Sequence, residues 1–321
     1  MSNSPLAAAP RLAGLDLLKL ALALLVVTIH ANPFRGVSEE LVWALGNGLA
    51  RVAVPCFFVV AGYNFRPEVP GRSGRMALRY LWLHLLWLTI YTPYWWPSVA
   101  AGGVVQYLKW WVLGWWHLWF LTALAITVVL AQAVWRWRMG AILALALGLL
   151  LAGFALQTAV GWRLLSSDLW PIQVRNAFFV GLPMFLLGYL TRRAGLAGRV
   201  GFRTALWAAG LGLAAAVGES EVMRMISPSP YPLAPETLLS AALAGPALVL
   251  AAVQAPALPN WLARLPLGIW SAGVYFIHVG IVIVLSKAFD LPRVVVYLSA
   301  VTGALALTTV LIRLRLAKRL F

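Results

Sequence analysis

The sequence predicts an all-α fold: a polytopic membrane helix bundle of about ten transmembrane helices, with both termini cytoplasmic. The 321 residues are 62% apolar and have a mean hydropathy of +0.87. Apolar runs of roughly 18 or more residues recur, and each is long enough to cross a ~30 Å hydrocarbon core. Basic residues gather between alternate runs, so the net charge of +16 indicates membrane topology and a lipid bilayer as partner, not nucleic acid.

Proline, glycine and charge clusters divide the apolar runs into ten candidate helices. They cover residues 12–33, 42–64, 76–97, 115–135, 139–160, 174–191, 203–218, 236–254, 266–286 and 293–312. With the N-terminus inside, the inner segments hold 16 basic residues and one acid, whereas the outer segments hold seven of each. This asymmetry satisfies the positive-inside rule. The outer loops are short apart from 219–236, so residues 1–321 are expected to form a single transmembrane domain.

The first candidate helix carries three ionisable side chains, Asp16, Lys19 and His30. Such groups are costly in hydrocarbon unless they are paired or line a wet cavity. Asp16 and Lys19 are i,i+3 neighbours that can pair, and His30 lies about 16 Å beyond Lys19 along the helix. One interpretation is an interfacial ion pair with a hydrogen-bonded histidine. The other is a polar track in which His30 acts as a general base.

Cysteine and histidine usage restricts the chemistry further. Cys56 is the only cysteine and lies within the second candidate helix, which excludes an internal disulfide and a thiolate metal site. The four histidines lack the i,i+3 or i,i+4 spacing of a ligand pair, so no metal is expected. The first helix is too long for a signal peptide and lacks a small-residue cleavage site, so we expect it to be retained.

Six segments resemble, in the same order, landmarks of the acyltransferase family 3 membrane proteins. They are LDLLKLALALLVVTIH (15–30), FFVVAGYNF (57–65), GRSGRMALRY (71–80), HLWFL (117–121), FFVGLPMFLLGYL (178–190) and SAGVYFIH (271–278). Lys19 and His30 fall on the family's helix-one cation and essential histidine, and Arg72 and Arg75 fall on its Arg-x-x-Arg. The cation is Lys19 where the family usually has arginine, which gives up the bidentate fork. Ala61 replaces the family's serine before Gly-Tyr.

The resemblance implies an integral membrane O-acyltransferase of the bacterial cytoplasmic (inner) membrane. Such enzymes move an acyl group, commonly acetyl, from cytoplasmic acyl-CoA to a hydroxyl of an envelope glycan or related acceptor, such as a lipid-linked saccharide. Arg72, Arg75 and Arg79 would hold the phosphates of acyl-CoA by charge-assisted hydrogen bonds, and Lys19 would line the path of the thioester. We therefore take His30, Lys19 and Asp16 as candidate catalytic residues, with His30 as general base or acyl carrier and Asp16 as the partner of Lys19.

Several residues near the outer ends of the predicted helices are candidates for contact with the acceptor. Asn47 and Arg51 share one face of the second helix, as Tyr275 and His278 share one face of the ninth. His278 is also a candidate partner for His30, although hydrogen bonding inside the bundle explains the same stripe. Trp116, His117 and Trp119 begin the fourth helix, where an aromatic belt and stacking on a sugar ring both explain the tryptophans.

Two other function classes remain open at this stage. One is a transporter or flippase for a lipid-linked glycan, with an intramembrane Lys/His relay. The absence of obvious inverted repeats and the cytoplasmic arginines argue against it. The other is a scaffold subunit, which would leave Lys19 and His30 without a purpose. Within the acyltransferase interpretation, an amine or amino acid acceptor is an alternative to a sugar hydroxyl.

Overall fold

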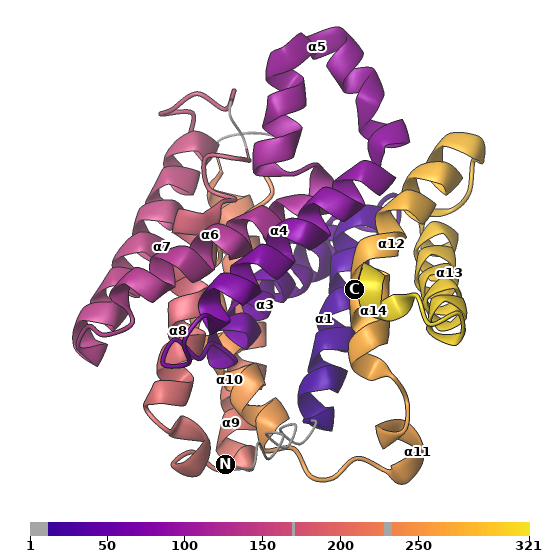
Figure 1. Ribbon diagram of the computed structural model, residues 1–321. Helices are drawn as coiled ribbons and strands as arrows, with labels where there is room; N and C mark the ends of the chain where they lie inside the picture. The colour runs from indigo at the N-terminus through magenta and orange to yellow at the C-terminus, as the bar shows by residue number, and fades with distance from the viewer. Residues whose placement is uncertain (1–11, 169–170, 228–232) are drawn as a thin grey trace.

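The computed structural model describes residues 12–168, 171–227 and 233–321, and across these ranges the regular structure is helical, without a strand (Figure 1). The α-helices are α1 (Ala13–Ala31), α2 (Glu39–Leu41), α3 (Ala53–Tyr63), α4 (Arg72–Ile90), α5 (Thr92–Leu113), α6 (Trp119–Val134), α7 (Met139–Gly161), α8 (Leu182–Arg193), α9 (Phe202–Ile226), α10 (Ala241–Val253), α11 (Asn260–Ala263), α12 (Leu267–Ala288), α13 (Arg293–Arg313) and α14 (Ala317–Leu320). Short 3₁₀ or π segments are η1 (Val42–Leu49), η2 (Ala50–Val52), η3 (Trp116–Leu118), η4 (Ala177–Gly181) and η5 (Leu196–Gly198).

Six helical segments in the described part of the chain are long and apolar enough to cross a membrane. They are Ala13–Ala31, Glu39–Tyr63, Trp116–Val134, Met139–Gly161, Leu267–Ala288 and Arg293–Arg313. The other four predicted spans coincide with α4, η4 with α8, α9, and α10. α4 carries three arginines in its first half, α9 is charged at both ends, and α8 and α10 are short. The protein is therefore a multi-pass helical membrane protein, whereas the count of ten and the sides of the termini stay predictions.

Two regions differ from the sequence-based expectation. Residues 98–114 were expected to be a short outer loop, but 98–113 belong to α5, which forms the arch at the top of Figure 1. The arch bends at Gly103, whose φ of 63° lies in the left-handed region that favours glycine. α9 continues to Ile226, through the first half of the segment 219–236 that was expected to be irregular. Part of that segment, 228–232, lies outside the described residues.

Helix pairs that are distant in sequence form the centre of the bundle. α1 packs against α12 over most of its length, α12 also packs against α13, and α4 packs against α6 (Figure 1). One continuous apolar core includes Leu22, Val26, Phe58, Phe185 and Val279. Because α1 and α12 lie side by side, the histidines on these two helices can meet inside the bundle.

The packing of α3 against α8 depends on two glycines. A Cβ atom on Gly62 would lie 1.9 Å from the carbonyl oxygen of Phe185, and one on Gly188 would lie 2.1 Å from that of Val59. The two helices therefore touch backbone to backbone, as small residues permit between membrane helices.

We expect Gly188→Ala to destabilise the bundle because the added methyl group must push α3 and α8 apart. The cost should be about 1–3 kcal/mol, which is typical of overpacking, and should lower the thermal unfolding midpoint of the purified protein. Gly210→Ala on α9 is the matched control, since nothing lies within 4 Å of its Cβ position. Equal midpoints for the two variants would contradict the close approach.

Candidate functional site

Three histidines from three separate elements meet inside the bundle. His30 lies in the last turn of α1, His117 in η3 and His278 in the middle of α12. The ring centroid of His278 lies 5.1 Å from that of His30 and 5.3 Å from that of His117. The ring centroids of His30 and His117 are 6.2 Å apart. His117 and His278 are buried, whereas His30 is partly exposed. Residues 248 positions apart in sequence thus form one polar cluster.

The hydrogen bonds of the cluster assign the protons of two rings. His278 Nδ1 lies 2.7 Å from the Val274 carbonyl, which can only accept, so Nδ1 carries the proton and Nε2 has a free lone pair. His30 Nδ1 lies 3.0 Å from the Val26 carbonyl and 3.1 Å from His278 Nε2. Nδ1 of His30 therefore donates to both acceptors. In the neutral ring this arrangement leaves His30 Nε2 unprotonated, which is the form that a general base or a nucleophile requires.

Aromatic residues hold the third histidine in place. Tyr275 donates a 2.6 Å hydrogen bond to the backbone carbonyl of His117, which ties η3 to α12. Neither ring nitrogen of His117 makes a well-formed hydrogen bond with a described residue, although the Phe276 carbonyl lies nearby. Trp116 stacks on His30, with 5.8 Å between ring centroids and an interplanar angle of 21°. The backbone of Trp116 has a φ of 49°, so this turn holds a non-glycine residue in the left-handed region.

A cavity of about 500 Å³ opens beside His30. Three of the residues expected near the acceptor line it: Arg51, Trp116 and Trp119. Lys109 and Arg175, which were predicted only to belong to the outer segments, line it as well. Its walls thus combine tryptophans, cations and one imidazole.

A buried carboxylate balances part of this positive charge. Glu236 Oε2 lies 2.9 Å from Arg51 Nη1 and 3.7 Å from Arg175 Nε, and Glu236, Arg51 and Arg175 line a smaller cavity that also touches His30. The side chains of Glu236 and Arg51 are only 8% and 14% exposed. Burial lowers the pKa of Arg175 from its usual value, an effect that the carboxylate of Glu236 opposes.

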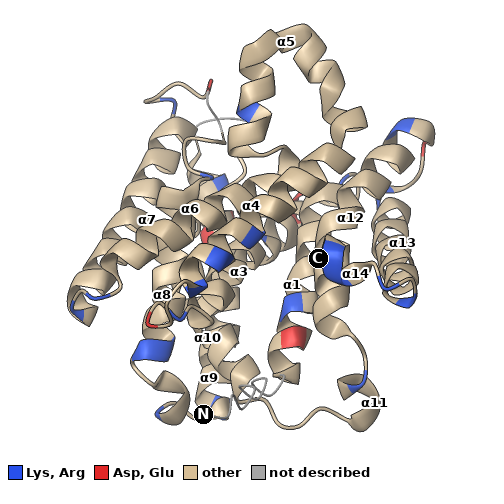
Figure 2. Ribbon diagram, in the orientation of Figure 1, with Lys and Arg blue, Asp and Glu red and all other residues tan. Residues whose placement is uncertain are grey.

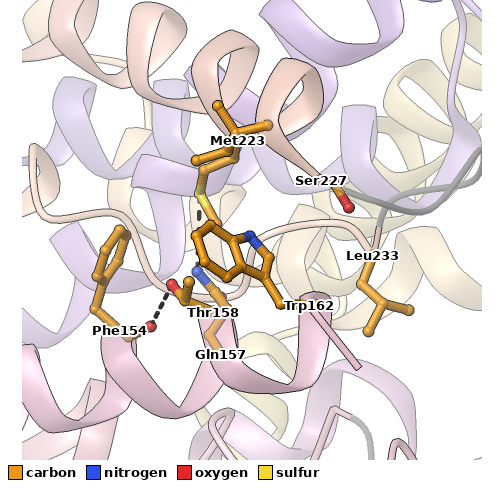
Figure 3. A pocket seen from close by; sticks show the side chains of 9 residues that line it. Phe154, Gln157, Thr158, Trp162, Met223, Ser227 and Leu233 are labelled. Carbon is orange, nitrogen blue, oxygen red and sulfur yellow. Dashed lines mark hydrogen bonds between the residues drawn. The ribbon is translucent and has the colours of Figure 1, made fainter. Parts of the chain in front are cut away.

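Gln157 on α7 fixes the position of Glu236. Its amide oxygen accepts hydrogen bonds from the backbone N–H groups of Glu236 (2.6 Å) and Thr237 (2.9 Å), and its amide nitrogen donates to the Thr237 carbonyl. Figure 3 shows Gln157 at the edge of a small, mostly apolar pocket of about 90 Å³ between α7 and α9, with its amide nitrogen 3.9 Å from the sulfur of Met223. The segment before α10 is thus held by Arg51 through the side chain of Glu236 and by Gln157 through the backbone.

Lys19 and Asp16 lie at the opposite end of α1 from His30. Lys19 Nζ lies 2.5 Å from Asp16 Oδ1, so the predicted ion pair is present. A Cβ atom on Gly268, at the start of α12, would fall 2.8 Å from the same carboxylate oxygen. The pair therefore lies where α1 meets the N-terminal end of α12, whose dipole favours a carboxylate. Figure 2 shows the two charges together on α1.

Three predicted arginines lie along the first half of α4, where Figure 2 shows a row of basic residues. The side chains of Arg72 and Arg75 are exposed. Arg79 is exposed as well, but it donates a hydrogen bond to the backbone oxygen of Phe321, and nearby Trp87 donates to the Leu320 carbonyl. Arg72 and Arg75 are thus accessible to a ligand, whereas Arg79 is engaged by the segment that follows α13.

The site brings together His30, His117, His278, Tyr275 and the outer tryptophans, whereas Asn47 does not line either cavity beside His30. Asn47 lies in η1, a π-helical stretch that replaces the regular helix expected there. Sequence reasoning missed Glu236 as the partner of Arg51, and Arg175 as the second cation beside that carboxylate. Their only signal was the presence of charged residues at the ends of apolar runs.

A multi-pass helical bundle with a histidine cluster beside a cationic, tryptophan-lined cavity fits a membrane enzyme that acts on a polar substrate. Residues 12–313 match the family profile described as "Acyltransferase domain", that of the acyltransferase 3 family. The chain therefore belongs to the acyltransferase 3 family, and the resemblance seen in the sequence is confirmed. Comparison with curated proteins and with solved structures finds no match.

We expect Glu236→Gln to destabilise the protein because it leaves Arg51 buried without its counter-charge. Breaking a buried ion pair costs about 3–5 kcal/mol, which should appear as a lower thermal unfolding midpoint. The double variant Arg51→Gln/Glu236→Gln should recover part of this loss. Glu221→Gln is the control, since Glu221 pairs with Arg224 at 2.8 Å on the more exposed face of α9. Equal effects of Glu236→Gln and Glu221→Gln would refute the assignment.

Proposed function

We propose that this membrane acyltransferase moves an acyl group, acetyl in the simplest case, from cytoplasmic acyl-CoA to a hydroxyl of an envelope glycan or lipid-linked saccharide. The observation that carries the proposal is the hydrogen bonding of His30. Its Nδ1 is fixed by Val26 and His278, so the free lone pair is on Nε2, and the ring borders a cavity of about 500 Å³. An oriented, unprotonated imidazole next to a space for substrate meets the geometric requirements of a general base.

The proposed reaction balances with His30 as the only proton carrier. His30 Nε2 removes the proton of the acceptor hydroxyl while the oxygen attacks the thioester carbonyl. A C–O bond forms, the C–S bond breaks, and the CoA thiolate takes the proton back from the imidazolium. In the alternative, Nε2 attacks the thioester carbonyl and the C–S bond breaks to release the CoA thiolate. The acceptor oxygen then attacks the acyl-histidine, the C–N bond breaks, and the thiolate takes the hydroxyl proton. Both routes use the same lone pair on Nε2. Isolation of an acyl-histidine would distinguish them in favour of the second.

The donor is proposed to approach from the end of α1 that carries Lys19. Arg72 and Arg75 would bind the phosphates by charge-assisted hydrogen bonds, and their exposure on α4 supports this role. Lys19 would attract the anionic donor toward the bundle while Asp16 holds the ammonium group in place. About 16 Å of helix separates Lys19 from His30, a distance of the same order as a pantetheine arm.

We expect His30→Ala to reduce acetyl-CoA turnover by about 10²–10⁴-fold in lipid vesicles that contain purified protein, because the general base is lost. His278→Ala removes one buried hydrogen bond from His30 and should cost about five- to thirtyfold in kcat. His278→Gln keeps an acceptor for the Nδ1 proton of His30 and should restore part of the rate, which a merely structural role would not predict.

The control for these variants is Arg203→Gln, an exposed change at the start of α9. Full turnover by His30→Ala would overturn the assigned role of His30. No turnover by the wild type with acetyl-CoA, other acyl-CoA donors or crude envelope glycans would overturn the proposed function, and solute uptake by the same vesicles would then favour the transporter alternative.

We expect Arg75→Gln to raise the KM for acetyl-CoA about tenfold or more with little change in kcat, because a charge-assisted contact to phosphate is lost. The variant should also discriminate less between acetyl-CoA and its dephospho form, which lacks one phosphate. An unchanged KM in both Arg75→Gln and Arg72→Gln would show that these arginines serve topology alone.

A further inference from the structure

The charge around the cavity beside His30 is unbalanced. Among the described residues that line it and the adjoining smaller cavity, the cations are Arg51, Lys109 and Arg175, and the single carboxylate is that of Glu236. One negative charge thus faces three positive ones. Cations held in a low-dielectric bundle are costly unless a counter-charge lies close.

The three cations differ in their availability to a ligand. Arg51 is engaged by Glu236 at 2.9 Å, although its Nε is buried without a hydrogen-bond partner among the described residues. Arg175 Nε lies 3.7 Å from the same carboxylate oxygen, which is too long for a hydrogen bond, and its guanidinium donates to no described residue, so it can bind another acceptor. Lys109 makes no ion pair within the described ranges, and its ammonium lies 5.7 Å from the ring centroid of Trp110.

The uncompensated charges come from two directions around the imidazole. Lys109 is carried by α5, and Arg175 by the segment just before η4. The Arg175 guanidinium lies 5.7 Å from the ring centroid of Trp119, and Trp116 stacks on His30. Flat aromatic faces for a sugar ring therefore alternate with cationic groups for an anion.

We propose that this cavity binds an anionic saccharide, one that carries a carboxylate or a phosphate, with Arg175 and Lys109 as the residues that select the negative charge. This inference rests on the proposed function, in which the acceptor hydroxyl must approach His30. It adds that the acceptor is acidic. Arg175 provides a planar fork that matches a carboxylate or phosphate, and Lys109 provides a point charge.

The test measures binding to the purified full-length protein in nanodiscs without any acyl donor. The probes are glucose, glucuronate and glucose 1-phosphate, which share one ring and differ in charge. We expect at least one anionic probe to bind about tenfold or more tightly than glucose. The preference should weaken as ionic strength rises, a readout that needs no variant. Glucuronate and glucose 1-phosphate distinguish a carboxylate from a phosphate ligand.

A matched pair of double variants tests whether Lys109 and Arg175 cause the preference for anionic probes. Lys109→Gln/Arg175→Gln should reduce it to about twofold or less. Lys287→Gln/Arg293→Gln removes the same charge from the connection between α12 and α13, on the same side of the bundle as α5, and should leave the preference intact (Figure 1). Lys109→Gln alone should cause a partial loss of the preference. This single variant replaces the double variant if the loss of the Arg175 packing on Trp119 prevents folding.

Equal binding of all three probes, or binding of none, would overturn the inference. So would a preference that survives in Lys109→Gln/Arg175→Gln, or displacement of glucose 1-phosphate by CoA with the same dependence on Arg175, since the cavity would then belong to the donor. The proposed acyl transfer is tested separately by acetyl-CoA turnover. A protein that neither binds nor consumes acetyl-CoA, yet keeps the charge-dependent binding, would refute the acyl transfer and retain the anionic ligand.

Discussion

A polar side chain inside a membrane bundle must find its hydrogen-bond partners within the protein, and this constraint organises the structure around His30. Among the described residues, no carboxylate makes a hydrogen bond to the His30 imidazole. The ring instead uses a carbonyl of its own helix and a second histidine on α12. Because His278 Nδ1 donates to Val274 in the same way, a chain of directed hydrogen bonds runs from His30 on α1 to α12. The packing of these two helices therefore selects the tautomer of the neutral His30 imidazole.

The two ends of α1 have different charged surroundings. At one end the pair of Lys19 and Asp16 meets the start of α12, and at the other His30 borders a cavity with Arg51, Lys109 and Arg175. A reaction between a cytoplasmic thioester and a polar acceptor needs two separate binding regions joined by one catalytic group. We propose that the first region binds acyl-CoA and the second an acidic saccharide, with His30 between them.

The sequence predicted the helical membrane fold and the separate positions of Lys19 and His30 because hydropathy and local spacing encode them, and the resemblance of its motifs predicted the family. It also marked His278 as a possible partner of His30 from its stripe on the ninth predicted helix. Other contacts between distant segments were not predictable. Glu236 pairs with an arginine 185 residues earlier, and its position depends on Gln157, so no local pattern announces it. The helix α5 was missed because Pro97, Gly102 and Gly103 suggested a loop, whereas the structure bends the helix at Gly103.

Histidine tautomers provide the most direct test of the central claim, that His30 is held with Nδ1 protonated and Nε2 free. We would measure ¹⁵N chemical shifts of selectively labelled histidine in the protein in lipid bilayers at neutral pH, with His30→Gln to assign the resonances. We predict a neutral His30 whose Nδ1 carries the proton, and a change in this pattern when His278 is replaced by alanine. A His30 that is protonated at Nε2, or that does not respond to the loss of His278, would contradict it.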